Sequence, residues 1–173
     1  DRSDGWHFLG GQAWSLLTVT KKGITPRQEN APMVIEAQYV PGFTWTRNPQ
    51  FRIVKDMDDN KLAAGISFES PQAIVFNGPN TPAGGAPIYN IGGGSGFAST
   101  NSYTTDLAPD IIAKLAYDPG YGHYEVYGLA RFFRDRTHVG GSNDTTIGGG
   151  GGAAAILPIV DKKLDFQISG LAG

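Results

Sequence analysis

Residues 61–69 read Lys-Leu-Ala-Ala-Gly-Ile-Ser-Phe-Glu, and this stretch decides the class of fold. Its even positions are apolar, whereas its odd positions are small or charged. The apolar positions are Leu62, Ala64, Ile66 and Phe68. Because successive side chains of a β-strand point to opposite faces, this alternation predicts a strand between an apolar and a polar environment.

The same two-residue alternation recurs along the chain, while helical spacing is nearly absent. It is clearest over residues 110–117, 123–135 and 163–172. Weaker candidate strands cover residues 6–17, 51–57 and 39–46. Two glycines interrupt the first of these, and Pro41-Gly42 breaks the last. The pattern predicts an all-β fold of about six or seven antiparallel strands.

The expected connections between strands differ in length. Residues 58–60 and 118–122 form short turns, whereas long, glycine-rich links span residues 70–109 and 136–155. Compact soluble domains seldom carry links of that length, but outer-membrane barrels combine short turns with long loops. We therefore expect residues 1–173 to form one domain that is part of an antiparallel transmembrane β-barrel.

Composition excludes several classes of protein. The 173 residues carry 14 Lys and Arg against 16 Asp and Glu, so binding of nucleic acid through bulk charge is not expected. Cysteine is absent, which removes disulfide scaffolds and thiol chemistry. No apolar run approaches 18 residues, as a transmembrane helix requires. The chain begins at Asp1 without Met or a signal peptide, and we expect an interior fragment of a larger barrel.

No motif in the chain predicts catalysis. Residues 56–60 resemble the start of a calcium loop, but Lys61 stands where Gly is needed and Ser67 where Glu is needed. The glycine tract at residues 92–96 has no following Lys-Ser/Thr, so it is not a phosphate-binding loop. The three histidines are dispersed without metal-ligand or triad spacing. We expect neither enzymatic activity nor a cofactor nor a metal ion.

Alternation also assigns residues to the two faces of the expected barrel wall. Tyr117, Tyr121 and Tyr124 flank the 118–122 turn, where an aromatic girdle at a membrane interface would lie. Charged residues fall on the opposite face, which predicts that they line a water-filled pore. These candidate pore-lining residues are Arg52, Glu125, Arg131, Lys114 and Asp165. The alternative is that such charges only pair with one another inside the barrel.

Three segments resemble a known family. Residues 11–15 read Gly-Gln-Ala-Trp-Ser and resemble the "GQ-x-W-S" segment of large bacterial outer-membrane porins. Residues 47–52 read Arg-Asn-Pro-Gln-Phe-Arg and resemble the "R-x-P-Q-x-R" strand of the same proteins. Residues 108–114 leading into 122–127 look like a porin hairpin. The resemblance is to the DcaP-like porins and, more distantly, to the phosphate-selective porins.

This resemblance implies a segment of a bacterial outer-membrane channel through which small hydrophilic solutes diffuse passively. Family members form a barrel of about sixteen strands and commonly assemble as homotrimers, with membrane lipid and lipopolysaccharide around the wall. A second hypothesis is a soluble β-sandwich that binds carbohydrate or mediates adhesion. In that case Trp6, Trp14 or Trp45 would serve as stacking platforms.

Overall fold

The computed structural model describes residues 4–31, 34, 40–71, 107–136, 143–160 and 163–173. This part of the chain contains seven β-strands and no helix. Consequently none of its segments is a helix long and apolar enough to cross a membrane.

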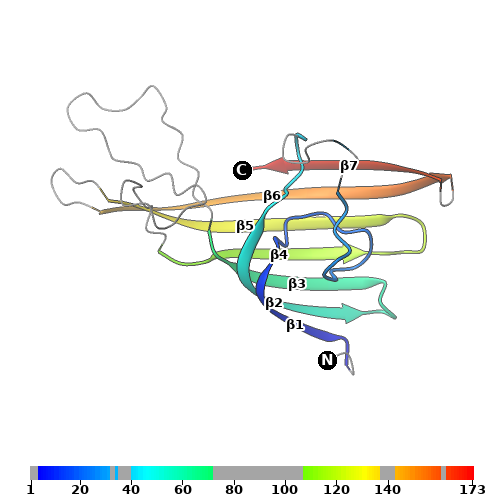
Figure 1. Cartoon of the computed structure of the whole chain (residues 1–173), viewed down its shortest axis with the longest axis horizontal. Helices are drawn as coiled ribbons and strands as arrows, with labels where there is room; N and C mark the ends of the chain where they lie inside the picture. The colour runs from blue at the N-terminus through cyan, green and yellow to red at the C-terminus, as the bar shows by residue number, and fades with distance from the viewer. Residues whose placement is uncertain (1–3, 32–33, 35–39, 72–106, 137–142, 161–162) are drawn as a thin grey trace. The chain divides into compact units, whose positions relative to one another are not determined.

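All seven strands belong to one sheet, in which each strand neighbours the next one along the chain (Figure 1). The strands are β1 (Trp6–Trp14), β2 (Arg47–Met57), β3 (Leu62–Glu69), β4 (Asp110–Tyr117), β5 (His123–Arg136), β6 (Asn143–Val160) and β7 (Leu164–Ala172). Pairing is antiparallel from β1 through β5 and again between β6 and β7. The expected all-β, antiparallel fold is therefore confirmed.

Both expected short turns are confirmed. The β2–β3 turn places Asp58, Asp59 and Asn60 at φ values of 51°, 51° and 65°. Asp and Asn adopt this left-handed region more readily than other side chains do, so the sequence suits the turn. In the β4–β5 turn, Gly122 has a φ of 77°, and a Cβ there would lie 2.9 Å from the carbonyl oxygen of Ile156.

Two expectations were wrong. The link expected over residues 136–155 is largely strand, because β6 covers Asn143–Val160 and includes the glycine tract at residues 148–152. These glycines pack tightly, since a Cβ on Gly152 would lie 2.5 Å from the carbonyl oxygen of Gly170. The weak strand expected over 39–46 does not form in residues 40–46, where Gly42 turns the chain at a φ of 75°. The tract at residues 92–96 lies outside the described residues.

The two faces of the sheet differ in chemistry. One face, here called the apolar face, carries large exposed hydrophobic side chains on its strands. The exception is residues 149–155 of β6, which are Gly and Ala. The members of the apolar face include Phe8, Phe51, Phe68, Leu115, Val126, Phe166 and Ile168. The opposite face carries the buried charged residues of β2 to β5, namely Arg52, Glu69, Asp110, Lys114 and Glu125. The faces match the assignment that alternation made for β3, β4, β5 and β7.

The buried face is covered by the chain between β1 and β2. This covering segment, residues 15–31 and 40–46, crosses the sheet in Figure 1 without forming a strand. Leu16 and Ile24 pack with Val54, Ala63 and Ile112 in one apolar cluster. Ile24 fits because residue 65 is glycine, where a Cβ would lie 3.2 Å from the Ile24 side chain. The sheet face under this segment is called the covered face below.

A second apolar cluster lies nearer β6. Val19 and Phe43 of the covering segment pack there with Tyr127 of β5 and Ala154 of β6. The indole rings of Trp14 and Trp45 also lie against each other, with centroids 3.8 Å apart. Both parts of the covering segment therefore contact the same face of the sheet.

By its internal contacts the chain divides into two compact units. One comprises residues 1–70, 110–130 and 149–173, and it holds the covered face and the covering segment. The other comprises residues 71–109 and 131–148, including one end of β5 and one end of β6.

Candidate functional site

The charged side chains of the covered face are almost completely buried. Glu69 is 0% exposed, Lys114 and Glu125 are each 2% exposed, and Arg52 is 4% exposed. Charged residues are rarely buried to this extent unless they are paired and hydrogen-bonded. Their partners therefore show what this face is built to hold.

Glu69, at the end of β3, holds the start of the covering segment. Its Oε1 accepts a hydrogen bond of 2.7 Å from the backbone N–H of Leu16 and another of 2.7 Å from Ser67 Oγ. Its Oε2 accepts one of 3.2 Å from Asn48 Nδ2. The carboxylate thus accepts a hydrogen bond from a backbone N–H just after the chain leaves the sheet at the end of β1.

Arg52 of β2 fixes the same point from the other side. Its Nη2 donates to the carbonyl oxygen of Trp14 at 2.5 Å, and its Nε donates to Gln50 Oε1 at 3.0 Å. Gln50 Nε2 in turn donates to the carbonyl oxygen of Ala13 at 2.9 Å. The last carbonyls of β1 are therefore bonded to side chains of β2 where the chain turns across the sheet.

Lys114 and Glu125 form the buried ion pair of the covered face. Lys114 Nζ lies 2.7 Å from Glu125 Oε2 and donates to the carbonyl oxygen of Thr18 at 2.7 Å. Glu125 Oε1 accepts a hydrogen bond of 3.0 Å from the backbone N–H of Thr20. The hydroxyl oxygen of Thr20 lies 2.5 Å from the same carboxylate oxygen. Both charges are thus used to hold residues 18–20 on the sheet.

His123, the first residue of β5, extends this network toward the β4–β5 turn. Its Nε2 lies 2.9 Å from Glu125 Oε1, and its Nδ1 lies 2.7 Å from Asp118 Oδ1. The other oxygen of Asp118 accepts a hydrogen bond of 2.8 Å from the backbone N–H of Gly23. Two carboxylates that bond the covering segment are therefore joined through one imidazole ring.

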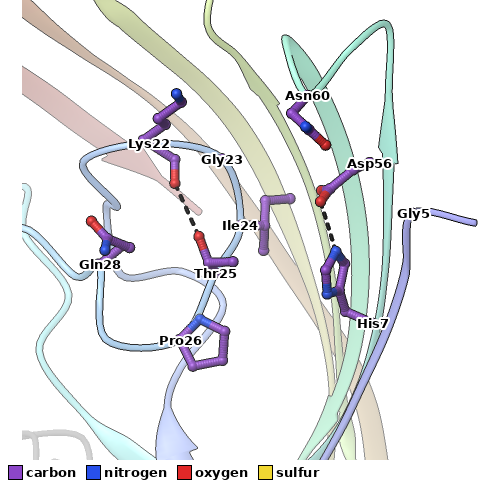
Figure 2. Close-up of a pocket in the computed structure, with 10 residues that line it drawn as sticks. All are labelled: Gly5, His7, Lys22, Gly23, Ile24, Thr25, Pro26, Gln28, Asp56 and Asn60. Atoms are coloured by element: carbon purple, nitrogen blue, oxygen red, sulfur yellow. Dashed lines mark hydrogen bonds and ion pairs between the residues drawn. The ribbon is translucent and has the colours of Figure 1, made fainter. Parts of the chain in front are cut away.

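Among the described residues, the covering segment lines two of the cavities. The first, of about 560 Å³, lies between residues 22–28 and the β2–β3 hairpin, with His7 Nε2 2.6 Å from Asp56 Oδ2 in its wall (Figure 2). The second, of about 860 Å³, is lined by β7 and by both parts of the covering segment. Asp165, Lys163 and Lys21 contribute charges to its wall.

The structure places the five candidate pore-lining residues in three different settings. Arg52, Lys114 and Glu125 lie on the covered face, beneath residues 14–20. Asp165 is exposed and lines the second cavity. Arg131 is half-buried on β5 in the other compact unit. Their role as the wall of a channel stays a prediction.

The sequence did not predict which groups these charged side chains bond. It assigned no role to Glu69, Asp118 or His123, and it did not identify residues 15–31 as a covering segment. A signal was present in Val19 and Ile24, which are apolar residues outside the expected strands. Leu16 lies in residues 15–17, the part of the expected strand 6–17 that does not form, because β1 ends at Trp14. Apolar side chains in a non-strand connection indicate that the connection packs against a core.

The fold itself indicates the class of protein. A single antiparallel sheet with one exposed apolar face and one polar face is the arrangement of an outer-membrane β-barrel wall. A comparison with known protein families finds no match, nor does a comparison with characterised protein sequences.

Among solved structures, the chain is similar to the outer membrane channel DcaP of Acinetobacter baumannii. The TM-score is 0.53 at 17% sequence identity, and the match covers 89% of this chain. The chain spans 35% of the length of that channel. At this identity the likeness concerns the fold, which is that of part of an outer-membrane β-barrel, and it does not favour the soluble β-sandwich.

Proposed function

We propose that the chain forms part of a bacterial outer-membrane channel through which small hydrophilic solutes diffuse passively. The observation that carries this proposal is the chemistry of the apolar face. Phe8 is 62% exposed and Val126 is 53% exposed, and similar side chains cover neighbouring strands. A continuous exposed surface of this kind marks contact with lipid or with another protein, and a closed barrel satisfies the backbone of its strands in lipid.

Aromatic residues at the turn end of the sheet support a membrane boundary there. Tyr117 is 48% exposed and pairs across the strands with Tyr124, and Tyr121 in the adjacent turn is 60% exposed. Trp6, at the same end of β1, is 45% exposed. Tyrosine and tryptophan are enriched where the apolar band of a barrel meets the lipid headgroups.

In this proposal the covered face points into the channel, and the covering segment forms its inner surface. Solutes then meet the segment instead of the buried charges of Arg52, Lys114 and Glu125. Those charges act on permeation indirectly, because they set where the segment lies. Asp165, at the exposed end of β7, and Arg131 remain candidates for direct contact with solute.

The test is a channel recording on the full-length protein together with one pair of variants. Purified protein reconstituted into a planar bilayer is expected to give discrete conductance steps. Leu115→Arg places a charge on the apolar face, two residues from Tyr117 at the proposed boundary. It is expected to destabilise the folded state in bilayers by about 1–2 kcal/mol, between the costs at the interface and at the midplane, whereas Leu115→Ala tolerates insertion.

The opposite result is equally clear. A face exposed to water accepts Leu115→Arg within about 0.5 kcal/mol, as exposed sites usually do. A protein that is monomeric in detergent-free buffer, is indifferent to Leu115→Arg and gives no conductance would rule out the channel and return the soluble module to consideration.

A further inference from the structure

We infer that protonated His123 is a positioning residue that keeps the covering segment against the channel wall. Loss of its proton releases the segment into the channel. The inference rests on the proposed function, because it assigns a positioning residue to that channel. It is carried by the geometry around the imidazole ring and by the charges that surround it.

Both nitrogens of the ring face carboxylate oxygens, Nδ1 toward Asp118 and Nε2 toward Glu125. An ionised carboxylate only accepts hydrogen bonds, so both ring nitrogens must donate, and only the imidazolium form carries two N–H groups. Imidazole is a stronger base than a carboxylate, so the ring carries the proton. Asp118 also accepts a hydrogen bond from Gly23 N–H, and Glu125 also accepts one from Thr20 and forms an ion pair with Lys114.

The charges around the ring balance only when it is protonated. Asp118 and Glu125 contribute two negative charges, and Lys114 contributes one positive charge from β4. From the neighbouring strand β6, residues 149–160 supply no titratable side chain. The covering segment brings Lys21 and Lys22, which are exposed to solvent, and Glu29, whose backbone pairs with Thr20.

Deprotonation would therefore turn a lone pair of the ring toward a carboxylate and leave one uncompensated negative charge under the segment. A buried charge without a partner is costly, and the arrangement relaxes by admitting water between the segment and the sheet. The two carboxylates affected are the acceptors for Gly23 and Thr20, so residues 20–23 lose their hold first.

The direction of the movement follows from the tethers. The covering segment is joined to β1 at Trp14 and to β2 at Arg47, and the sheet closes one side. When released, it moves only away from the wall, which in the proposed channel is toward the lumen. The expected result is obstruction of current.

The experiment is single-channel recording of the full-length protein across about pH 5–9, the range in which histidines titrate. Wild type is expected to show a stable open current at the acidic end and a several-fold lower mean current with frequent closures at the alkaline end. His123→Gln is expected to show closures at every pH. His123→Arg keeps a cation with several donors and is expected to stay open throughout.

His7→Gln and His138→Gln are matched controls, and the pH response is expected to survive in both. His7 faces one carboxylate, Asp56, at 2.6 Å, and it therefore lacks the bridging arrangement. A response that disappears in either control while persisting in His123→Gln overturns the inference.

A second measurement applies if His123→Gln fails to insert. Because the chain has no cysteine, Val19→Cys places one thiol beneath the segment, where Val19 is 1% exposed. Its labelling by a water-soluble maleimide is compared at each pH with the same thiol in the His123→Arg background, which cancels the intrinsic pH dependence of the thiol. Faster labelling at alkaline pH with His123 alone is expected.

The failures are distinguishable. If the full-length protein forms channels but neither the current nor Val19→Cys labelling responds to pH, the positioning role of His123 is wrong and the proposed channel stands. If the protein forms no channel at any pH, both the proposed function and the positioning role of His123 are wrong.

Discussion

The covering segment meets two differently built parts of the sheet. Over β2 to β5 it is held by buried charges, with Glu69, Lys114 and Glu125 bonded to backbone atoms of residues 16–20. Over β6 and β7 the segment meets Ala154, Gln167 and Ser169, and the charges there, Lys163 and Asp165, lie in the wall of the second cavity. There the segment makes two neutral hydrogen bonds, from Asn30 Nδ2 to Gln167 Oε1 at 2.6 Å and from Ser169 Oγ to the carbonyl oxygen of Gly42 at 3.0 Å.

The two parts of the sheet therefore act on the segment in different ways. Buried charges anchor it through bonds, whereas small residues determine how closely it packs. A buried ion pair contributes little net stability compared with an apolar pair, but removing one of its partners is strongly destabilising. Small residues act otherwise, because they set how closely backbones approach and not which groups are bonded. Substitutions on β2 to β5 should therefore detach the segment, whereas substitutions on β6 should disturb the sheet itself.

The largest effect is expected for Lys114→Met, which keeps the length of the side chain and removes its charge. Asp118 and Glu125 then share only the His123 cation, so one buried negative charge is left uncompensated. We expect the free energy of unfolding of the full-length protein to fall by about 3–5 kcal/mol. The measurement is urea unfolding of the reconstituted barrel, followed by tryptophan fluorescence.

The double variant Lys114→Met/Glu125→Gln is the control for this prediction. It leaves no uncompensated charge at the pair, so its loss should be smaller than that of Lys114→Met alone. Equal or greater loss in the double variant would show that these charges do not act as a pair.

A smaller effect is expected for Glu69→Gln. The change removes a charged acceptor from the Leu16 N–H and places an amide donor next to Asn48 Nδ2, which is itself a donor. Hydrogen bonds to charged groups contribute about 1.5–3 kcal/mol, and we expect a loss in that range. Hydrogen exchange at the Leu16 amide should accelerate, with Ser67→Ala as a milder control. An unchanged Leu16 amide would contradict the anchoring role.

The sequence predicted the strands well wherever one face is apolar and the other polar. Over Leu62–Glu69, Asp110–Tyr117 and Leu164–Ala172 the two-residue period is complete, and the assignment of faces followed from it. Both hairpins with short turns were also predictable, because Asp, Asn and Gly occupy the positions that turn.

Strand β6 and the covering segment could not be predicted in the same way. Glycine and alanine at residues 148–155 have no polar or apolar alternation, and their place in the sheet depends on close contact with Tyr127 and Gly170. Likewise alternation placed Arg52, Lys114 and Glu125 opposite the apolar side chains, as in the structure, but their partners include backbone atoms up to 105 residues away in sequence. A local pattern carries no information about such contacts.

Two glycines on paired strands sharpen the contrast between fit and anchoring. A Cβ on Gly152 would lie 2.5 Å from the Gly170 carbonyl oxygen and 2.6 Å from Tyr127 Cε2, whereas a Cβ on Gly170 would meet nothing within 4 Å. We expect Gly152→Ala to lower the free energy of unfolding by about 1–2 kcal/mol through overpacking. Gly170→Ala should change it by less than about 0.5 kcal/mol. Equal losses in urea unfolding would mean that β6 does not pack as closely as these contacts require.

The smallest effect is expected for Ser169→Ala on β7. Ser169 is half-buried, and water replaces its hydrogen bond to the Gly42 carbonyl oxygen, so the loss should be about 0.5 kcal/mol. The informative measurement is hydrogen exchange, residue by residue, along the covering segment. Exchange should accelerate near Phe43, whose amide bonds the carbonyl oxygen of Val40, and stay unchanged at Gly23, whose amide bonds Asp118.

Faster exchange at Gly23 as well would mean that the segment opens as one cooperative unit, and that β7 anchors it as much as the buried charges do. Unchanged exchange at Gly23 has the opposite consequence, because opening free energies differ between parts of a structure that are held independently. The stretch over β2 to β5 would then stay on the wall while the stretch over β7 opens. In that case the charged half of the covered face determines where the segment lies, and the small-residue half determines only how closely it approaches.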